Sequence, residues 1–262
     1  MGVNQFLIKN RRNFVIIGVV GAALNVLAML VFQPWGPRLG VASSMNRQYI
    51  RMIFGTWLFN VPWALYAASI VASKPKWLAP RGRYQEGMEY PVFTTYTYVA
   101  IALCAALFAA SGVLSYEFFD LPAAPAALSV TFFNPIIGFF TLWLGGVLRA
   151  LIYGTGNPLM WAISSGPSDG STWIFLGLFY WWFREETKWG KNLLSLLVYW
   201  VVVYCLWRFV WMFQLYVWLF PVPALWTRVV WFWTQFLPSG VLGTLAGLVV
   251  TEVLIRAVER GR

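Results

Sequence analysis

The chain has 262 residues, of which 60% are hydrophobic and only 11% are charged; soluble domains have about 25% charged residues, so an ordinary soluble fold is excluded. The net charge of +10 comes from basic residues in short loops between apolar runs, which is the positive-inside pattern of membrane proteins rather than a nucleic-acid-binding face. Histidine is absent, which argues against haem, copper, nickel, cobalt and catalytic zinc, and no metal or other cofactor is expected.

The apolar runs are about 20 residues long, as membrane-spanning helices require. They predict spans, in chain order, over residues 13–32, 50–72, 95–116, 126–153, 171–183, 192–220 and 230–258. The connections include a basic segment at 74–90, an acidic turn at 117–125, a Gly/Pro/Ser-rich loop at 154–170 and a charged turn at 184–191. No alternation of the β-barrel type occurs, so the predicted fold is an all-α integral membrane protein.

The topology depends on Asn134-Pro135, which interrupts the run 126–153. An unbroken helix there would place the basic turn 184–191 and the basic tail outside. Proline removes a backbone donor and disfavours helix at the preceding residue, so we expect a break. The chain then has eight helical membrane segments in the cell membrane, with both termini and most basic residues in the cytoplasm.

The break leaves a helix over 126–133 that reaches only about 12 Å and cannot span the bilayer alone. Non-helical backbone at this depth must be buried in protein or line a cavity. The sequence therefore predicts an internal cavity that opens outward.

Arg208 lies near the middle of a predicted span, where a charge costs at least about 2.5 kcal/mol. Such a residue faces a polar cavity or a partner. Glu252 lies roughly half the bilayer away and has Arg256 as a closer neighbour four residues on. We expect Arg208, with Arg149, to face the cavity and to meet an anionic or carbonyl-bearing ligand group. Alternatives are that Arg149 snorkels to the membrane surface, or that these cations form structural pairs with Glu117, Asp120 or Asp169.

Aromatic and amide side chains accompany these charges. Trp207, Trp211, Gln214 and Trp218 share the helix of Arg208 at spacings of three and four, and an aromatic face beside one cation suits a flat heteroaromatic ligand. Asn157, Trp161 and Asp169 lie in the 154–170 loop and are candidate lid groups. Lipid-facing tryptophans and a solvated connector explain the same patterns without a ligand.

From about residue 91 onward, three stretches carry a family resemblance. They are YVAIALCAALFAASG (98–112), SVTFFNPIIGFFTLWLGGVLRALIYGTGNPLMW (129–161) and GVLGTLAGLVVTEVLIRAVERGR (240–262). Their order resembles the substrate-binding (S) component of energy-coupling factor (ECF) transporters, which has six membrane helices with a short second one. Residues 1–73 depart from that family as a two-helix membrane extension, joined by the cytoplasmic linker 74–90 to the S-component-like domain 91–262.

The resemblance implies an importer subunit that binds a vitamin or related micronutrient and partners a membrane coupling subunit and two cytoplasmic ATPases. It implies that Ala102, Ala106 and Ala110, one helix stripe, dock the coupling subunit; packing within this chain is the alternative. No catalytic nucleophile, carboxylate pair or metal-ligand cluster stands out, so an enzyme is not expected. The extra spans and the many tryptophans favour a second hypothesis, a non-catalytic structural subunit of a larger membrane complex.

Overall fold

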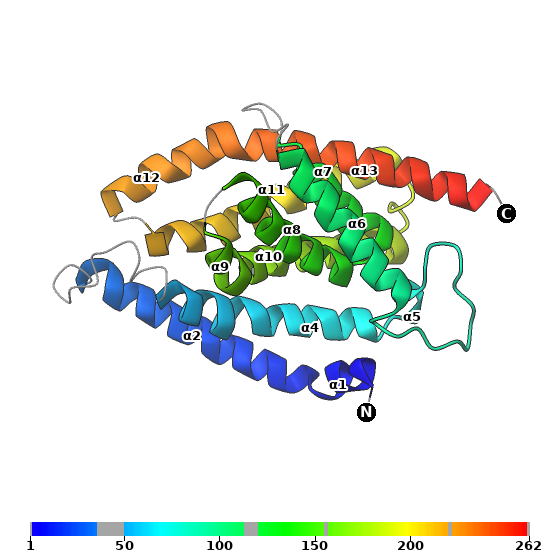
Figure 1. The fold of residues 1–262 in the computed structure, drawn as a ribbon, viewed down its shortest axis with the longest axis horizontal. Coiled ribbons are helices and arrows are strands. Elements are labelled where there is room, and N and C mark those ends of the chain that lie inside the picture. Colours follow the sequence, from blue (N-terminus) through cyan, green and yellow to red (C-terminus); the bar gives the residue numbers. More distant parts are fainter. Residues whose placement is uncertain (1, 36–49, 113–119, 155–156, 220–221, 261–262) are drawn as a thin grey trace.

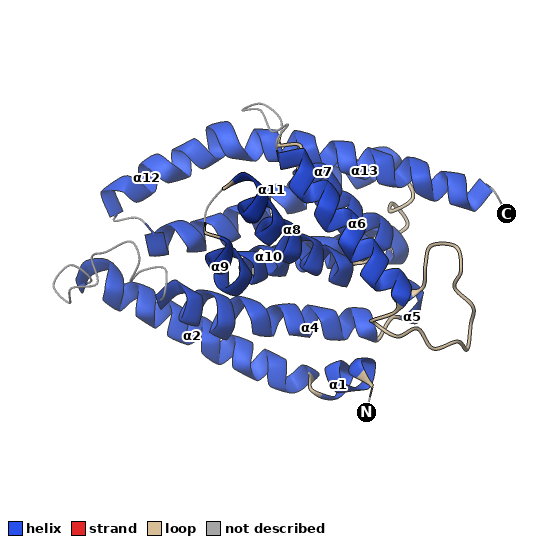
Figure 2. Ribbon diagram, viewed as in Figure 1, coloured by secondary structure: helices blue, strands red, loops and turns tan. Residues whose placement is uncertain are grey.

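A computed structural model describes residues 2–35, 50–112, 120–154, 157–219 and 222–260, without the side chains of 31–35, 214–219 and 222–224. Every regular element in these ranges is helical (Figures 1 and 2). In chain order the elements are α1 (Val3–Lys9), α2 (Arg11–Trp35), η1 (Met52–Asn60), α4 (Val61–Ala72), α5 (Pro75–Leu78), α6 (Thr95–Ser111), α7 (Ala123–Leu128), η3 (Ser129–Phe133), α8 (Pro135–Tyr153), α9 (Pro158–Met160), η4 (Trp161–Ser165), α10 (Gly166–Glu186), α11 (Leu193–Leu219), α12 (Val222–Trp231), η5 (Phe232–Phe236) and α13 (Leu237–Arg260). The η elements are π-helical turns that continue into the neighbouring α-helices.

Five helices among the described residues are long and apolar enough to cross a membrane. They are Arg11–Leu30, Met52–Ala72, Pro135–Tyr153, Leu193–Phe213 and Leu225–Arg260, with shorter apolar helices at Thr95–Ser111 and Ala123–Phe133. Large apolar side chains remain exposed along them, as at Leu206, which is 62% exposed. This is the all-α, multi-pass membrane architecture that the composition predicts.

The predicted break between the fourth and fifth segments is confirmed. Asn134 is extended, with φ −167° and ψ 166°, and separates η3 from α8. Its side chain accepts a hydrogen bond from the backbone N–H of Ile137, and Pro135 occupies the first helical position, where its missing N–H costs nothing. The preceding helix starts at Ala123, three residues before the predicted start.

An arginine from the linker stabilises the other side of this break. Arg81 donates from Nη2 to the carbonyl oxygen of Thr131 at 2.9 Å and from Nε to that of Phe132 at 3.1 Å. The last carbonyls of a helix have no partner within it and carry partial negative charge, so a guanidinium satisfies both needs. The break is therefore a capped structure rather than a local disruption.

The prediction of a loop over residues 154–170 is wrong. Only residues 154 and 157 of its described part are non-helical, since α9, η4 and α10 run on from Pro158. Its small residues serve close packing instead: a Cβ on Gly166 would lie 2.6 Å from Trp143, and one on Gly170 would lie 2.6 Å from the carbonyl oxygen of Phe139. Composition typical of a loop thus marks a helix pressed against α8.

The predicted start of the last span at residue 230 is also wrong. Helix begins at Val222 and continues through α12, η5 and α13 to Arg260. The motif PVPALWTR contains two prolines, but Pro223 falls in the first turn of the helix, where proline is tolerated.

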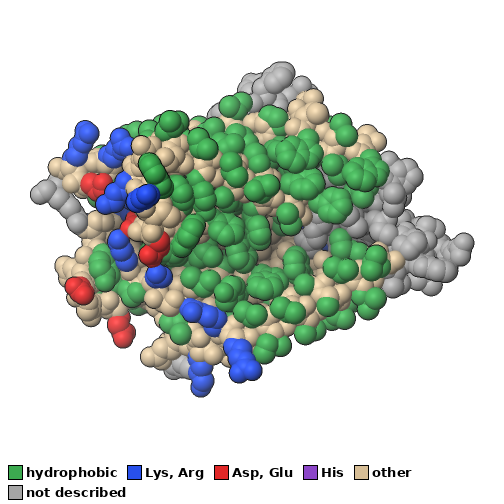
Figure 3. All heavy atoms as spheres, turned by 180° about the vertical axis from the view of Figure 1, so that it is seen from behind, with side chains coloured by type: hydrophobic (Ala, Val, Ile, Leu, Met, Phe, Trp, Pro, Cys, Tyr) green, Lys and Arg blue, Asp and Glu red, His purple; other side chains and the backbone are tan. Residues whose placement is uncertain are grey.

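The helices form one bundle in which α6 and α10 pack on α8, and α4 packs on α10. α13 lies against α7 through small residues, since Cβ atoms on Gly243 and Gly247 would meet the carbonyl oxygens of Asp120 and Ala124. In Figure 1, α5, the start of α1 and the end of α13 lie toward the same end of the molecule. Lys and Arg gather at one end of the face in Figure 3, beside a broad apolar surface.

A charged cavity beside the broken helix

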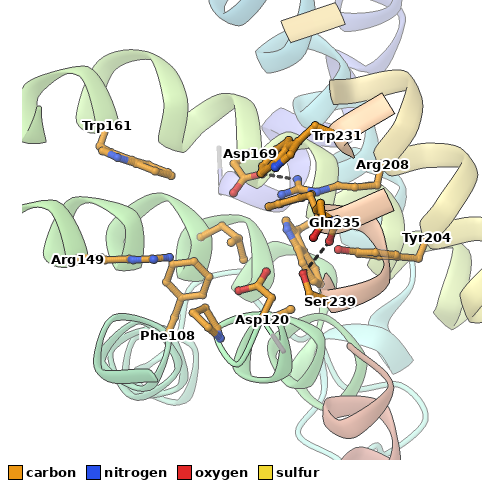
Figure 4. A pocket seen from close by; sticks show the side chains of 15 residues that line it. Phe108, Asp120, Arg149, Trp161, Asp169, Tyr204, Arg208, Trp231, Gln235 and Ser239 are labelled. Carbon is orange, nitrogen blue, oxygen red and sulfur yellow. Dashed lines mark hydrogen bonds and ion pairs between the residues drawn. The ribbon is translucent and has the colours of Figure 1, made fainter. Parts of the chain in front are cut away.

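The described residues line an open cavity of about 730 Å³. Two arginines and two aspartates line it, Arg149, Arg208, Asp120 and Asp169, with an aromatic wall and two uncharged polar groups (Figure 4). The aromatic residues are Phe108, Trp161, Trp173, Tyr204, Trp231 and Phe236, and the uncharged polar ones are Gln235 and Ser239. Its size is in the range of small-molecule sites, which are about 300–1,000 Å³.

Both helices that meet at the break line this cavity, but with residues distant from the break itself. The short helix contributes Pro122 and Ala123, at its start. The helix that follows the break contributes Leu142 and Arg149. The backbone N–H of Asp120 donates to the carbonyl oxygen of Ser239 at 3.3 Å, which joins the entrance of the short helix to the last helix.

The cavity wall contains an ion pair between Arg208 of α11 and Asp169 of α10. Nη1 of Arg208 lies 2.6 Å from Oδ1 of Asp169, and the two residues are 8% and 7% exposed. The guanidinium also lies 4.5 Å from the ring centroid of Trp211, a cation–π distance. Nε of Arg208 is buried and has no hydrogen-bond partner among the described residues. Removing one member of such a pair typically costs about 3–5 kcal/mol, because it leaves a buried charge alone.

Neighbouring contacts hold Asp169 in place. Nδ2 of Asn60, in the second predicted span, donates to Oγ of Ser168 at 2.7 Å, and Nε1 of Trp211 donates to the carbonyl oxygen of Ser168 at 3.1 Å. One turn earlier, Oγ1 of Thr56 lies 3.3 Å from Oγ of Ser164. The first turn of α10 is therefore tied to the N-terminal helices and to α11.

The structure brings together five of the residues that the sequence indicated as ligand-binding groups or as their charge partners, namely Asp120, Arg149, Trp161, Asp169 and Arg208. Trp211 stands behind the guanidinium of Arg208. Asn157 is exposed and caps α9, where its side chain accepts from the N–H groups of Leu159 and Met160. Glu117 and the side chain of Gln214 lie outside the described residues. The prediction that Trp161 and Asp169 belong to a lid loop is wrong, because both residues lie in helices.

Five further residues line the cavity that were not predicted from the sequence, namely Trp173, Tyr204, Trp231, Gln235 and Ser239. Three of them, Tyr204, Gln235 and Ser239, could have been found from helical spacing. Tyr204 precedes Arg208 by four residues, and Gln235 precedes Ser239 by four, so each pair shares one helix face. Trp173 and Trp231 are indistinguishable in sequence from tryptophans that face lipid.

A second charged cluster lies at the other end of α10. Nε of Arg184 lies 3.0 Å from Oε1 of Glu252, and the hydroxyl of Tyr180 donates to the same oxygen at 2.7 Å. The sequence indicated Arg256 as the closer cation to Glu252, but the structure pairs Glu252 with Arg184. The helix continues to Glu186, which keeps Arg184 on an inward face toward α13, whereas Arg256 is exposed.

The linker closes this cluster. Arg81 lies 3.5 Å from the Glu185 carboxylate, and Lys74 forms an ion pair with Glu186 at 2.8 Å. Burial tends to raise the pKa of Glu185, but its hydrogen bond with Lys76 and the charges of Lys76, Arg81 and Arg184 outweigh burial and lower it. Glu185 is therefore ionised at neutral pH.

The predicted docking stripe lies on one exposed face of α6, and the neighbouring alanines lie on a buried face. Ala102, Ala106 and Ala110 are exposed, whereas Ala105 and Ala109 are buried. Packing within the chain uses the second face, because Ala105 approaches Gly145 of α8 closely. The stripe that the resemblance assigns to a partner is left uncovered by the described residues.

Within the described residues, no group of three His, Cys, Asp or Glu side chains could hold a metal ion. Comparison of the chain with family models, with curated proteins and with solved structures finds no match.

Proposed function

We propose that the chain is the substrate-binding membrane subunit of an importer, of the ECF type, and that it captures a vitamin or related micronutrient in the charged cavity. The observation that carries this proposal is the cavity itself, with the buried Arg208–Asp169 pair in its wall. Charges inside a membrane protein are costly and mark substrate pathways or structural pairs. A cavity beside the pair, with the volume of a small-molecule site, favours the interpretation of these charges as part of a substrate pathway.

The position of the cavity along the bundle supports capture from outside. Asp169 and Arg184 lie on the same helix, and their separation in sequence corresponds to roughly 22 Å along its axis. The Arg184 end carries the linker cluster with Lys74, Lys76 and Arg81. The positive-inside rule places this basic end in the cytoplasm, which leaves the cavity near the outer face. Eight membrane segments with both termini inside fit this orientation.

The exposed stripe of Ala102, Ala106 and Ala110 supports a partner helix in the membrane. Small residues let two helix backbones approach closely, and interfaces between membrane helices use them for that reason. In the proposed assembly a coupling subunit covers this stripe, and cytoplasmic ATPases supply the energy.

A ligand-binding experiment with two matched variants tests the proposal. The purified protein is titrated with a panel of vitamins and their precursors, and binding is measured by calorimetry. Arg208→Gln and Arg184→Gln each break a buried arginine–carboxylate pair, but only Arg208 lines the cavity. We expect a ligand to bind wild type and Arg184→Gln, and to bind Arg208→Gln at least tenfold more weakly. Equal affinity in both folded variants would contradict the proposal.

The structural-subunit hypothesis remains the alternative, and the two N-terminal helices favour it because the common six-helix form lacks them. Mass spectrometry of material purified under mild conditions separates the two functions. A stoichiometric small molecule supports ligand capture. Persistent membrane subunits other than a coupling subunit and its ATPases, with no small molecule, support the structural role.

A further inference from the structure

A second hollow of the molecule is an apolar groove of about 650 Å³ that runs over α10, between α11 and α4. Both α4 and α11 pack on α10. Three of the lining residues, Trp182, Leu206 and Val210, are exposed and form the rim, whereas the others are half-buried. Every described residue that lines the groove is apolar or aromatic, namely Ile70, Leu178, Phe179, Trp182, Tyr199, Val203, Leu206, Trp207 and Val210.

Aromatic contacts fix the shape of this groove. Nε1 of Trp207 donates to the carbonyl oxygen of Thr172 at 3.2 Å, and the Trp207 ring lies 5.7 Å from the ring of Phe179. Tyr199 stacks on Phe183 with 4.0 Å between the ring centroids, and its hydroxyl donates to the carbonyl oxygen of Phe179 at 3.4 Å. A site formed in advance loses little conformational freedom when it is occupied.

The groove has the length of one membrane leaflet. It extends along α11 from Tyr199 to Val210, which corresponds to roughly 16 Å of helix rise. Half of a typical hydrocarbon core is about 15 Å thick. Trp182 and Tyr199 lie at the end nearer the turn between α10 and α11, and aromatic residues of this kind gather where the membrane meets water. The dimensions therefore fit one acyl chain that lies parallel to the helices.

Two lysines lie beyond this aromatic end. The turn 187–192 joins α10 to α11, and it carries Lys188 and Lys191, both exposed. Neither lysine forms an ion pair with a described residue, whereas Glu186, just before the turn, pairs with Lys74. Basic residues between membrane helices at the membrane surface bind the headgroups of anionic lipids.

We propose that this groove binds one anionic phospholipid from the leaflet at the basic end of the bundle, with an acyl chain along α10 and α11 and the phosphate at Lys188 and Lys191. The site goes beyond the proposed function and does not depend on it. An acyl chain gains little free energy by leaving other lipids, so close packing in the groove fixes its position and the headgroup charge selects the lipid. The bound chain fills the space between α4 and α11, and it thereby joins the N-terminal helices to the rest of the bundle.

Native mass spectrometry of the full chain in detergent tests this proposal. The probes are phosphatidylglycerol, which is anionic, and phosphatidylcholine, which is zwitterionic, with identical acyl chains. The measured quantity is the dissociation constant of the first bound lipid. A lysine near an anionic headgroup contributes a factor of about five, so we expect the wild-type protein to bind phosphatidylglycerol about 25-fold more tightly than phosphatidylcholine.

Matched double variants separate the two lysines from the general basic charge. Lys188→Gln/Lys191→Gln should abolish the preference for phosphatidylglycerol. Arg256→Gln/Arg260→Gln should keep it, because this variant removes two exposed charges from the end of α13, which contributes no residue to the groove. No preference in the wild-type protein, or equal effects of the two double variants, would identify ordinary surrounding lipid and overturn the proposal.

A second pair of variants tests the place of the acyl chain. Val203→Trp fills the groove, whereas Val202→Trp puts the same side chain on an exposed part of α11 outside it. We expect Val203→Trp to weaken the binding of both lipids about tenfold or more, and Val202→Trp to leave it unchanged. Equal effects of the two variants would overturn the proposal, as would dimers that Val203→Trp abolishes, since these would assign the groove to a second copy of the chain. If Val203→Trp does not fold, the lysine variants decide.

Discussion

Arg81→Ala should destabilise the protein strongly, because this side chain caps the helix that ends inside the bundle. Its guanidinium donates to the carbonyl oxygens of Thr131 and Phe132 and lies 3.6 Å from the ring centroid of Trp181. A hydrogen bond to a charged group contributes about 1.5–3 kcal/mol, so two contribute at least about 3 kcal/mol. The cation–π contact adds about 0.5–2 kcal/mol.

Lys76→Ala is the matched control, since Lys76 and Arg81 both pair with Glu185 but Lys76 is 59% exposed. An exposed ion pair contributes about 0–1 kcal/mol. Unfolding free energies are measured in mixed micelles by titration with a denaturing detergent, with tryptophan fluorescence as the signal. Arg81→Lys should lie between the two variants, because an ammonium lacks the planar fork that reaches both carbonyls. If Arg81→Ala loses no more stability than Lys76→Ala, the capping role is refuted.

Two further changes test the packing and the charged cluster. Gly247→Val should destabilise the protein by about 1–3 kcal/mol in the same assay, because its Cβ would clash with the carbonyl oxygen of Ala124. Gly2→Ala is the control and should not change the stability, because no atom lies within 4 Å of the added Cβ. An unchanged stability of Gly247→Val would contradict the close packing of α13 on α7. The folded state holds the pKa of Glu185 below its usual value, so its contribution to stability is present above the unfolded pKa of about 4.3 and is lost as the pH falls through the folded pKa. Glu185→Gln should remove this part of the acid sensitivity in unfolding measured from about pH 7 to pH 3, and an unchanged pH profile would argue against the cluster.

The elements that the sequence predicted well are those whose signals are local. A run of apolar residues needs only its length to indicate a membrane helix, and Asn134-Pro135 combines a helix N-cap with a residue that ends the preceding helix. A cavity is present as predicted, but not for the predicted reason: Arg81 covers the backbone at the break, and the cavity lies at the other end of the short helix, beside Pro122 and Ala123.

The failures concern residues whose meaning depends on a partner distant in the sequence. The glycines and serines before Asp169 read as a loop until α8 and the N-terminal helices are placed against them. Glu252 had a local neighbour in Arg256, but Arg184 comes from a helix whose length the sequence underestimated. The tryptophans that line the cavity could not be separated from those that face lipid, since both occur at helical spacing in apolar runs.

The central claim is that the broken helix frames a cavity that opens to the outside, opposite the basic end. Labelling of intact cells with a membrane-impermeant thiol reagent tests it most directly, with Gln235→Cys in the cavity and Trp189→Cys in the charged turn, where Trp189 is 57% exposed. We predict that Gln235→Cys is labelled in intact cells and Trp189→Cys only after permeabilisation. Labelling of the charged turn from outside, with the cavity thiol protected until the cells are opened, would contradict this account.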